Sequence, residues 1–233
     1  MMKWDAFRCL SFDCYGTLID WESGLIASLR PVLAAHSVEC ESERLLALFS
    51  QAESRAESGE YRSYRTVLED VLGMIGQQLS FQPNRAERQA FAESLKEWPV
   101  FPDTCQALQA LSKRYKLVIL SNVDDDLFVA TQKQLGVSFH DVLTAQKIGS
   151  YKPDSRNFQH LVDTVGFAKR EIVHVAQSLF HDIGPAKALG LSTVWVNRRQ
   201  GREGGATPPS VAVPDVTVSS LEALVRLVEG QTG

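Results

Sequence analysis

Four groups of polar residues lie directly after strand-like runs of this 233-residue chain. The most informative is Asp13, which follows the apolar run of residues 7–12 and precedes a turn that contains Gly16. A carboxylate at such a place can act as a nucleophile, because ligands of open α/β sheets bind beyond the carboxyl ends of the strands. The other groups are Ser121 with Asn122, Lys152, and Asp182.

These residue types suit one chemistry if the fold brings them together. A lysine close to Asp13 would keep the carboxylate ionised while it is partly desolvated, and Lys152 suits that role. Alone, Lys152 would be read as a surface residue, because lysine is rarely buried. Ser121 and Asn122 could donate to a substrate carboxylate or to Asp13, although alone they would be ordinary turn residues. Thr17 is either a member of the site or a helix-capping hydroxyl.

The elements that must position these residues alternate between strands and helices. Strands are predicted at residues 7–12, 116–120, 142–144, 172–176, 193–197 and 216–218, and helices at residues 103–114, 124–135, 154–165, 182–189 and 221–228. Asp103 and Asp124 stand where acids cap helix starts. This rhythm predicts an α/β fold with a doubly wound parallel sheet. Residues 21–98 lack strand-like runs and carry apolar residues at helical spacing, so we interpret them as a helical insert.

Composition is that of a soluble globular protein. With 44% hydrophobic residues the chain can bury a full core, and its net charge of -4 disfavours nucleic acid and anionic membranes as partners. We therefore expect a small-molecule partner and, without a signal-peptide pattern or membrane span, a cytoplasmic location. The four cysteines lack metal-cluster spacing, and a disulfide framework is not expected. The sequence does not determine the oligomeric state and leaves a homodimer open.

The ordered set Asp13, Thr17, Ser121 with Asn122, Lys152 and Asp182 resembles the haloacid dehalogenase (HAD) superfamily, whose four motifs occur in this order. Residues 12–18 (FDCYGTL) and 150–153 (SYKP) are similar to the L-2-haloacid dehalogenase (type II) branch, and the resemblance covers nearly the whole chain. The resemblance is closer still to azetidine-2-carboxylate hydrolase, a relative that opens a strained amino-acid ring. The stretches that carry it are Asp20-Trp21-Glu22, Trp98-Pro99, Ser178-Leu179 with His181-Asp182, and Arg198-Arg199 with Gly205-Ala206-Thr207.

The resemblance implies a HAD-like Rossmannoid core at residues 1–19 and 99–233, with an α-helical cap inserted at residues 20–98. It implies that Asp13 attacks a substrate carbon to form an aspartyl ester. Water then hydrolyses the ester, oriented or activated by Asp182 with Lys152 or His181. The expected substrate is a small 2-substituted carboxylic acid, with neither a cofactor nor a metal. The residues expected to bind it are Tyr15, Thr17, Ser121, Asn122 and Gln177.

Two positions separate the chain from HAD phosphatases. Those enzymes carry a second aspartate two residues after the nucleophile, where this chain has Tyr15, and a phenol is a poor acid at neutral pH. Their acidic magnesium ligand aligns with Gln177, and a neutral amide weakens such a site. Both differences favour attack on carbon. A magnesium-dependent phosphatase and a catalytically silent small-acid binding protein are the alternatives.

The match to haloacid dehalogenases also has a gap. The arginine that holds the departing halide is missing from the aligned residues 48–53, and Leu179 and Gln177 stand where that family has asparagine and serine around the hydrolytic water. The sequence therefore leaves the leaving group open between a halide, an amine and another group. An amine cation could be held by Glu53 or Asp124 through charge-assisted hydrogen bonds. We therefore expect a strained or otherwise activated 2-substituted acid to be a better substrate than 2-chloropropionate.

Overall fold

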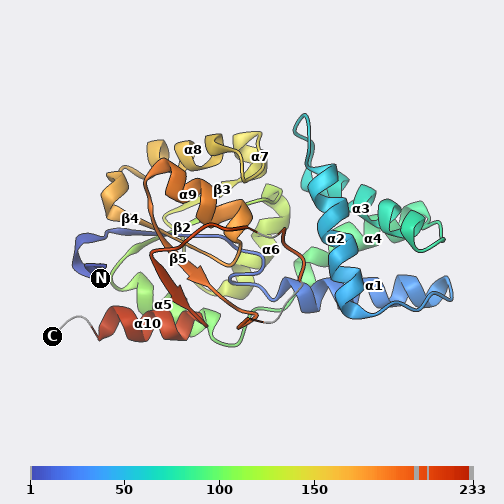
Figure 1. Ribbon diagram of the computed structural model, residues 1–233, viewed down its shortest axis with the longest axis horizontal. Helices are drawn as coiled ribbons and strands as arrows, with labels where there is room; N and C mark the ends of the chain where they lie inside the picture. Colours follow the sequence, from blue (N-terminus) through green and yellow to red (C-terminus); the bar gives the residue numbers. More distant parts are fainter. Residues whose placement is uncertain (1, 202–204, 209, 231–233) are drawn as a thin grey trace.

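The computed structural model describes residues 2–201, 205–208 and 210–230, and its centre is a six-stranded parallel sheet (Figure 1). The strand order across the sheet is β3 (Asp141–Thr144), β2 (Lys116–Ser121), β1 (Cys9–Phe12), β4 (Ile172–Ala176), β5 (Ser192–Val196) and β6 (Val216–Val218). In the ladders Phe12 pairs with Ile119 of β2 and Val175 of β4. The carboxyl ends of these three strands therefore lie along one edge of the sheet. The parallel sheet with its flanking helices confirms the predicted α/β fold class.

Helices cover both faces of the sheet, which explains why its central strands are almost continuously apolar. On one face Leu117 and Ile119 share a core cluster with α5 (Thr104–Ser112), α6 (Asp125–Leu135) and α10 (Leu221–Glu229). On the other face Val118 and Leu120 pack with α8 (Ser155–Val165) and α9 (Gly184–Leu189). Figure 1 shows α8 and α9 above the sheet and α5 and α10 below it.

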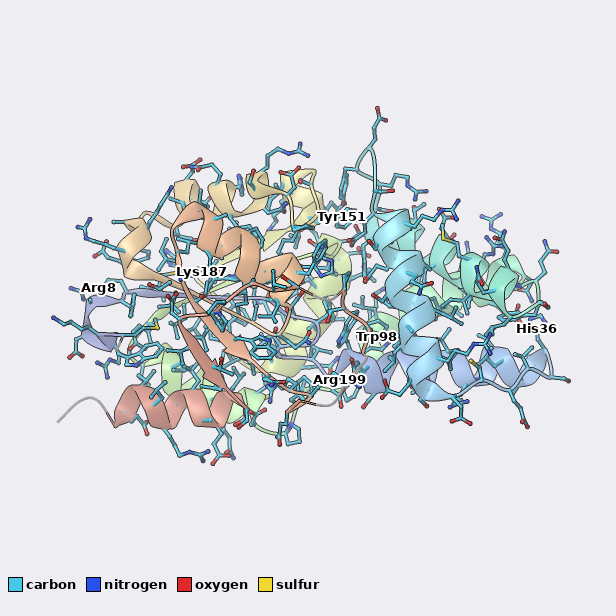
Figure 2. The ribbon with its side chains drawn as sticks, in the orientation of Figure 1. Arg8, His36, Trp98, Tyr151, Lys187 and Arg199 are labelled. Atoms are coloured by element: carbon cyan, nitrogen blue, oxygen red, sulfur yellow. The ribbon has the colours of Figure 1, made fainter. Side chains whose placement is uncertain are left out.

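Four helices between β1 and α5 form a separate layer beside the sheet (Figure 1). They are α1 (Trp21–Ala35), α2 (Ser42–Ala56), α3 (Tyr64–Gln78) and α4 (Arg85–Glu93), followed by a 3-10 turn, Ser94–Glu97. Figure 2 shows Tyr151, Trp98 and Arg199 where this layer meets the sheet. The helical insert is confirmed, whereas its division from the core at residues 20 and 98 stays a prediction. No helix in the described part of the chain is long and apolar enough to cross a membrane.

Asp103 and Asp124 were predicted to cap the helices that follow them. Their side chains instead bind the starts of other helices. Asp103 makes no side-chain cap hydrogen bond to α5, and its Oδ2 instead accepts the Leu221 N–H of α10 at 2.7 Å. Asp124 makes none to α6, and its two oxygens accept the N–H groups of Tyr64 and Arg65 at 2.8 and 2.9 Å. Both aspartates stand at the predicted helix starts, but their side chains cap other helices, because the free N–H groups at a helix start donate to any well-placed carboxylate, including one distant in sequence.

The segment around Asp182 also differs from the prediction. A helix was predicted from residue 182, but a wide π-type turn, Leu179–Ile183, comes first, and α9 starts at Gly184. The Ser178 hydroxyl accepts the His181 N–H at 2.9 Å and fixes the start of this turn. A short helix, α7 (Ala145–Ile148), precedes Lys152 and was not predicted, because four residues are too few to show a helical period. Asp182 is therefore held inside a turn rather than at a helix end.

Candidate active site

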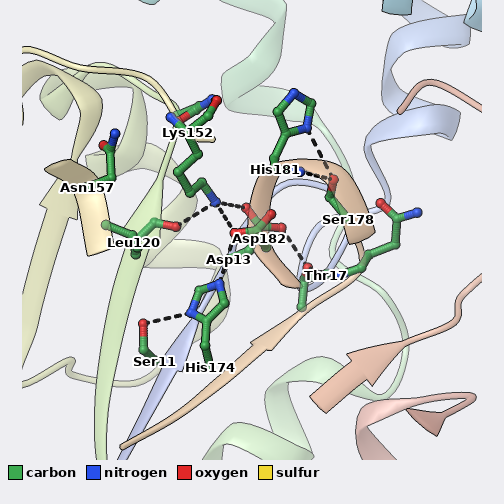
Figure 3. Close-up of polar contacts among 12 residues, drawn as sticks. Ser11, Asp13, Thr17, Leu120, Lys152, Asn157, His174, Ser178, His181 and Asp182 are labelled. Atoms are coloured by element: carbon green, nitrogen blue, oxygen red, sulfur yellow. Dashed lines mark hydrogen bonds and ion pairs between the residues drawn. The ribbon is translucent and has the colours of Figure 1, made fainter. Parts of the chain in front are cut away.

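The three side chains predicted to be catalytic meet at the carboxyl end of the sheet (Figure 3). The Lys152 ammonium lies 2.8 Å from Asp13 Oδ1 and 2.6 Å from Asp182 Oδ1, and it donates a third hydrogen bond to the Leu120 carbonyl at 3.0 Å. Only 2% of Lys152 is exposed. A buried ammonium is tolerated when its donors are paired in this way, and a single lysine here neutralises one of two carboxylates.

The two carboxylates around Lys152 differ in proton affinity. Burial raises the pKa of Asp13 and the Asp182 charge adds to it, although the Lys152 ammonium and the Thr17 hydroxyl oppose the rise. Burial also disfavours the ionised form of Asp182, but Lys152 and His174 outweigh it and lower the pKa of Asp182 to about 2. Asp13 is therefore the more basic of the two carboxylates, a property that would suit a nucleophile, while Asp182 keeps its negative charge.

The turn after β1 fixes the orientation of Asp13. Thr17 Oγ1 donates to Asp13 Oδ2 at 2.6 Å and accepts the Gln177 N–H at 2.9 Å. Thr17 thus contacts the proposed nucleophile, and Asp20 is the residue that caps α1. Gly16 has φ +95°, and a Cβ at this position would lie 2.9 Å from Trp21 Nε1. The turn therefore requires glycine.

A small pocket of about 50 Å³ opens above Asp13, with walls from the sheet and from the helical insert. Its size suits a small molecule. The residues that line it are Asp13, Tyr15, Trp21, Glu53, Glu57, Tyr64, Ser121, Asn122, Lys152, Ser178, His181, Asp182 and Thr207. The residues predicted to be catalytic or to bind the substrate carboxylate are all in this set except Thr17 and Gln177.

Ser121 and Asn122 contribute in different ways. Ser121 is buried, and its Oγ has no hydrogen-bond partner within the described residues, so it is free to bind a ligand. The Asn122 side chain accepts the Lys152 N–H at 2.8 Å and donates to the Lys152 carbonyl at 3.0 Å. Asn122 therefore positions the backbone that carries Lys152.

Tyr15 and Gln177 offer less to a ligand than their motif positions suggest. The Tyr15 hydroxyl lies 2.9 Å from Thr131 Oγ1, so the residue contributes its ring to the pocket and not its hydroxyl. Gln177 lines a separate groove of about 780 Å³ between α2 and the segment after β5. Its carbonyl accepts the Trp195 indole N–H at 2.8 Å. The Gln177 backbone N–H donates to Thr17, whereas its side chain does not line the pocket above Asp13.

The helical insert adds two acids to the pocket. Glu53 is 7% exposed, and Tyr64 donates its hydroxyl to Glu53 Oε1 at 2.5 Å. Burial raises the pKa of Glu53 to about 7. Burial, together with the Glu53 charge, raises the pKa of Glu57 well above its usual range. Neither acid has an ion-pair partner among the described residues, so a bound cation would stabilise their ionised forms.

Asp124, which the sequence offered as a second holder of an amine cation, is not part of the pocket wall. Both of its oxygens are occupied by backbone N–H groups of α3, which corrects that expectation. His181 does line the pocket, and burial lowers its pKa to about 4, so its imidazole is neutral at physiological pH.

The haloacid dehalogenase-like hydrolase family matches residues 7–190, from the first strand through α9. The chain belongs to the haloacid dehalogenase-like hydrolases. The match includes Asp13, Lys152 and Asp182, and it confirms the superfamily that the order of motifs indicated.

Several relatives of the chain are (S)-2-haloacid dehalogenases, and others are phosphatases. The hydrolase is 27% identical to (S)-2-haloacid dehalogenase 4A of Burkholderia cepacia over 203 residues, which is 84% of this chain and 85% of the relative. It is 25% identical to (S)-2-haloacid dehalogenase of Pseudomonas sp. (strain YL) over 232 residues, or 98% and 97% of the two chains. A solved dehalogenase with an intermediate complex matches with a TM-score of 0.80 and 26% identity, covering 96% and 97%. These matches confirm the resemblance to the dehalogenase branch, whereas a special likeness to azetidine-2-carboxylate hydrolase stays a prediction.

Two residues at or beside the site, Glu57 and His174, were not among the predicted site residues. Glu57 was not considered, although it follows Glu53 by one helical turn beside the buried Ala56. An acid within the buried stripe of a helix is the signal that could have revealed it. His174 lies within the predicted strand at residues 172–176, and its Nε2 is 2.9 Å from Asp182 Oδ1.

Proposed function

We propose that this hydrolase acts on a small 2-substituted carboxylic acid through an ester formed on Asp13. One observation carries the proposal: Asp13 forms part of the wall of a small pocket, with one oxygen on Thr17 and the other on Lys152. A carboxylate oriented in this way suits in-line attack on carbon. The similarity to (S)-2-haloacid dehalogenases supports a reaction at the 2-carbon.

In the first step an oxygen of Asp13 attacks the 2-carbon of the substrate. The new C–O bond forms as the bond to the 2-substituent breaks, and the substituent leaves with the electron pair. The unpartnered Ser121 hydroxyl would donate to the substrate carboxylate and orient it for this attack. Because the buried Ser121 hydroxyl has no hydrogen bond to give up, it gains one when the substrate carboxylate binds.

In the second step water attacks the carbonyl carbon of the Asp13 ester. Asp182 accepts the proton of the water, and the Lys152 ammonium stabilises the negative charge that develops on the carbonyl oxygen. Collapse of the tetrahedral intermediate breaks the bond between the Asp13 carbonyl carbon and the product oxygen. The 2-hydroxy acid takes up the proton held by Asp182, and Asp13 returns as a carboxylate when the second proton of the water is released to solvent.

We further propose that the leaving group is the amine of a strained ring, as in azetidine-2-carboxylate, rather than a halide. A halide ion needs cationic or hydrogen-bonding neighbours, but among the lining residues the only lysine or arginine is Lys152, which already pairs with two carboxylates. Glu53 and Glu57 instead favour a cation in this pocket. A protonated ring nitrogen leaves as a neutral amine and keeps its electron pair, and ring strain supplies driving force.

Two measurements test the proposal. The first compares kcat/KM for azetidine-2-carboxylate and 2-chloropropionate, and a haloacid preference of about tenfold, or about 1.4 kcal/mol, would reject the amine leaving group. The second is a single turnover in heavy-oxygen water, in which the label should enter Asp13 before the product. Label that appears directly in the product, with Asp13 unlabelled, would reject the ester.

A further inference from the structure

His174 contacts Asp182, one of the three residues proposed to be catalytic, from within the sheet. It lies on β4 and is fully buried, and it is absent from the set of residues that line the pocket. Its Nε2 is 2.9 Å from Asp182 Oδ1, and its Nδ1 is 3.1 Å from Ser11 Oγ on the neighbouring strand (Figure 3). The edge-to-face contact with Phe158, at 5.2 Å between ring centroids, restricts the ring plane.

The charge of Asp182 determines which nitrogen of His174 carries a proton. An ionised carboxylate only accepts hydrogen bonds, so Nε2 must donate. The Ser11 hydroxyl faces Nδ1 and can complement that state, since a hydroxyl both donates and accepts. The position of Ser11 is fixed by the ladder, where it pairs with His174.

The two donors on Asp182 act on the same oxygen. His174 Nε2 and Lys152 Nζ both contact Oδ1, at 2.9 and 2.6 Å. Within the described residues Oδ2 takes no hydrogen bond, and Asp182 lines the pocket. Two donors at Oδ1 prevent rotation of the carboxylate, so Oδ2 is the oxygen available to water. They also keep the acid ionised, because burial alone would favour its protonated form, which cannot accept a proton.

We propose that His174 is a positioning residue for the second half-reaction, in which it turns Asp182 Oδ2 toward the water that attacks the Asp13 ester. This role rests on the proposed function. Water loses one proton to Asp182 Oδ2 as its oxygen bonds to the ester carbonyl carbon. The departing 2-hydroxy acid then takes up a proton as its bond to Asp13 breaks. His174 exchanges no atom with the substrate, and the first step needs no proton transfer to Asp182, so loss of His174 affects the second step selectively.

The test measures the two half-reactions separately, by rapid quenching and mass spectrometry of the protein after mixing with azetidine-2-carboxylate or 2-chloropropionate. In His174→Phe the ester should form at nearly the wild-type rate and decay about 100-fold more slowly, so that it accumulates. In His174→Gln the amide nitrogen can donate from a similar place, and ester decay should be partly restored. Ser11→Ala should slow decay to a smaller extent, because Nδ1 loses its partner.

Thr193→Val is the matched control. Thr193 is buried on β5, pairs with His174 in the ladder and bonds to Asp215, outside the catalytic cluster. Its loss should lower stability without changing the ratio of the two rates. Equal slowing of both steps in His174→Phe and His174→Gln, matched by the control, would overturn the role of His174. Absence of an ester on the wild-type protein with both substrates would overturn the proposed function itself and, with it, this role.

Discussion

Replacement of Glu53 by glutamine should make the stability of the chain less dependent on pH. Burial on α2 raises the pKa of Glu53 from the ordinary 4.5 to about 7, even though the Tyr64 hydroxyl donates to it. Between these values the folded protein holds a proton that the unfolded chain has released. The free energy of unfolding therefore has the full contribution of this group below pH 4.5, and loses it as pH rises through 7.

The size of this change in stability follows from the change in the pKa of Glu53 on folding. A change from 4.5 to about 7 corresponds to roughly 3 kcal/mol at most, and Glu53 is 7% exposed, so solvent screens it little. Glutamine resembles the protonated acid, and its carbonyl can still accept from Tyr64. Glu53→Gln should thus match the wild type near pH 5 and become more stable than the wild type toward pH 8. Relief of repulsion on Glu57 acts in the same direction.

Urea unfolding of both proteins across pH 5 to 8 measures this difference. Glu60→Gln is the matched control, because it makes the same chemical change at an exposed position just after α2. The free energy of unfolding of this control should differ from that of the wild type by the same amount at every pH. If Glu53→Gln also kept a constant offset from the wild type, Glu53 would ionise as an exposed glutamate does, and the proposed cation preference of the pocket would lose its main support.

Three further predictions concern the nucleophile, the metal and the contact between insert and core. Asp13→Asn should abolish product formation while the circular dichroism spectrum and melting temperature are retained, because an amide of the same shape cannot form the ester; turnover by this variant would contradict the assignment. A chelator of divalent cations should leave the rate nearly unchanged, because Lys152 neutralises charge between Asp13 and Asp182; activity that disappears and returns with magnesium would favour a phosphatase-like mechanism. Asp124→Ala should cost about 1 kcal/mol of stability and speed hydrogen exchange at the Tyr64 and Arg65 amides, with α8 amides as the internal reference.

The sheet was predictable because its strands carry their own signal. Residues 172–176 coincide with β4, and residues 116–120 fall one residue short of β2, since strands buried on both faces read as apolar runs. Helix starts were less predictable. Asp103 and Asp124 have the right residue type at the right place, but a cap also needs a partner, and theirs come from α10 and α3. Local sequence identifies an acceptor, whereas tertiary packing selects its donors.

The candidate site also contains residues that the sequence predicts and residues that only tertiary packing positions. Asp13, Lys152 and Asp182 follow strands or lie in turns at the carboxyl edge of one sheet. Their places after predicted parallel strands were therefore enough to predict that they lie close together. Glu57 is positioned by the way α2 docks on the sheet, which no periodicity specifies. His174 was assigned correctly to a strand, but its contact with Asp182 depends on the wide turn after β4.

The pocket combines two kinds of residue, and this combination has a consequence for specificity. The side chains proposed for bond making come from the sheet, whereas the acids Glu53 and Glu57 and the hydroxyl of Tyr64 come from α2 and the segments beside it. Because Asp13 is held by Lys152 and Thr17 of the core, the charge of the insert wall can change without moving this proposed nucleophile. An acidic wall selects a cationic substituent, and a basic wall would select an anionic one. Under the proposed function, the insert would therefore set the leaving group, and the core would set attack on the 2-carbon.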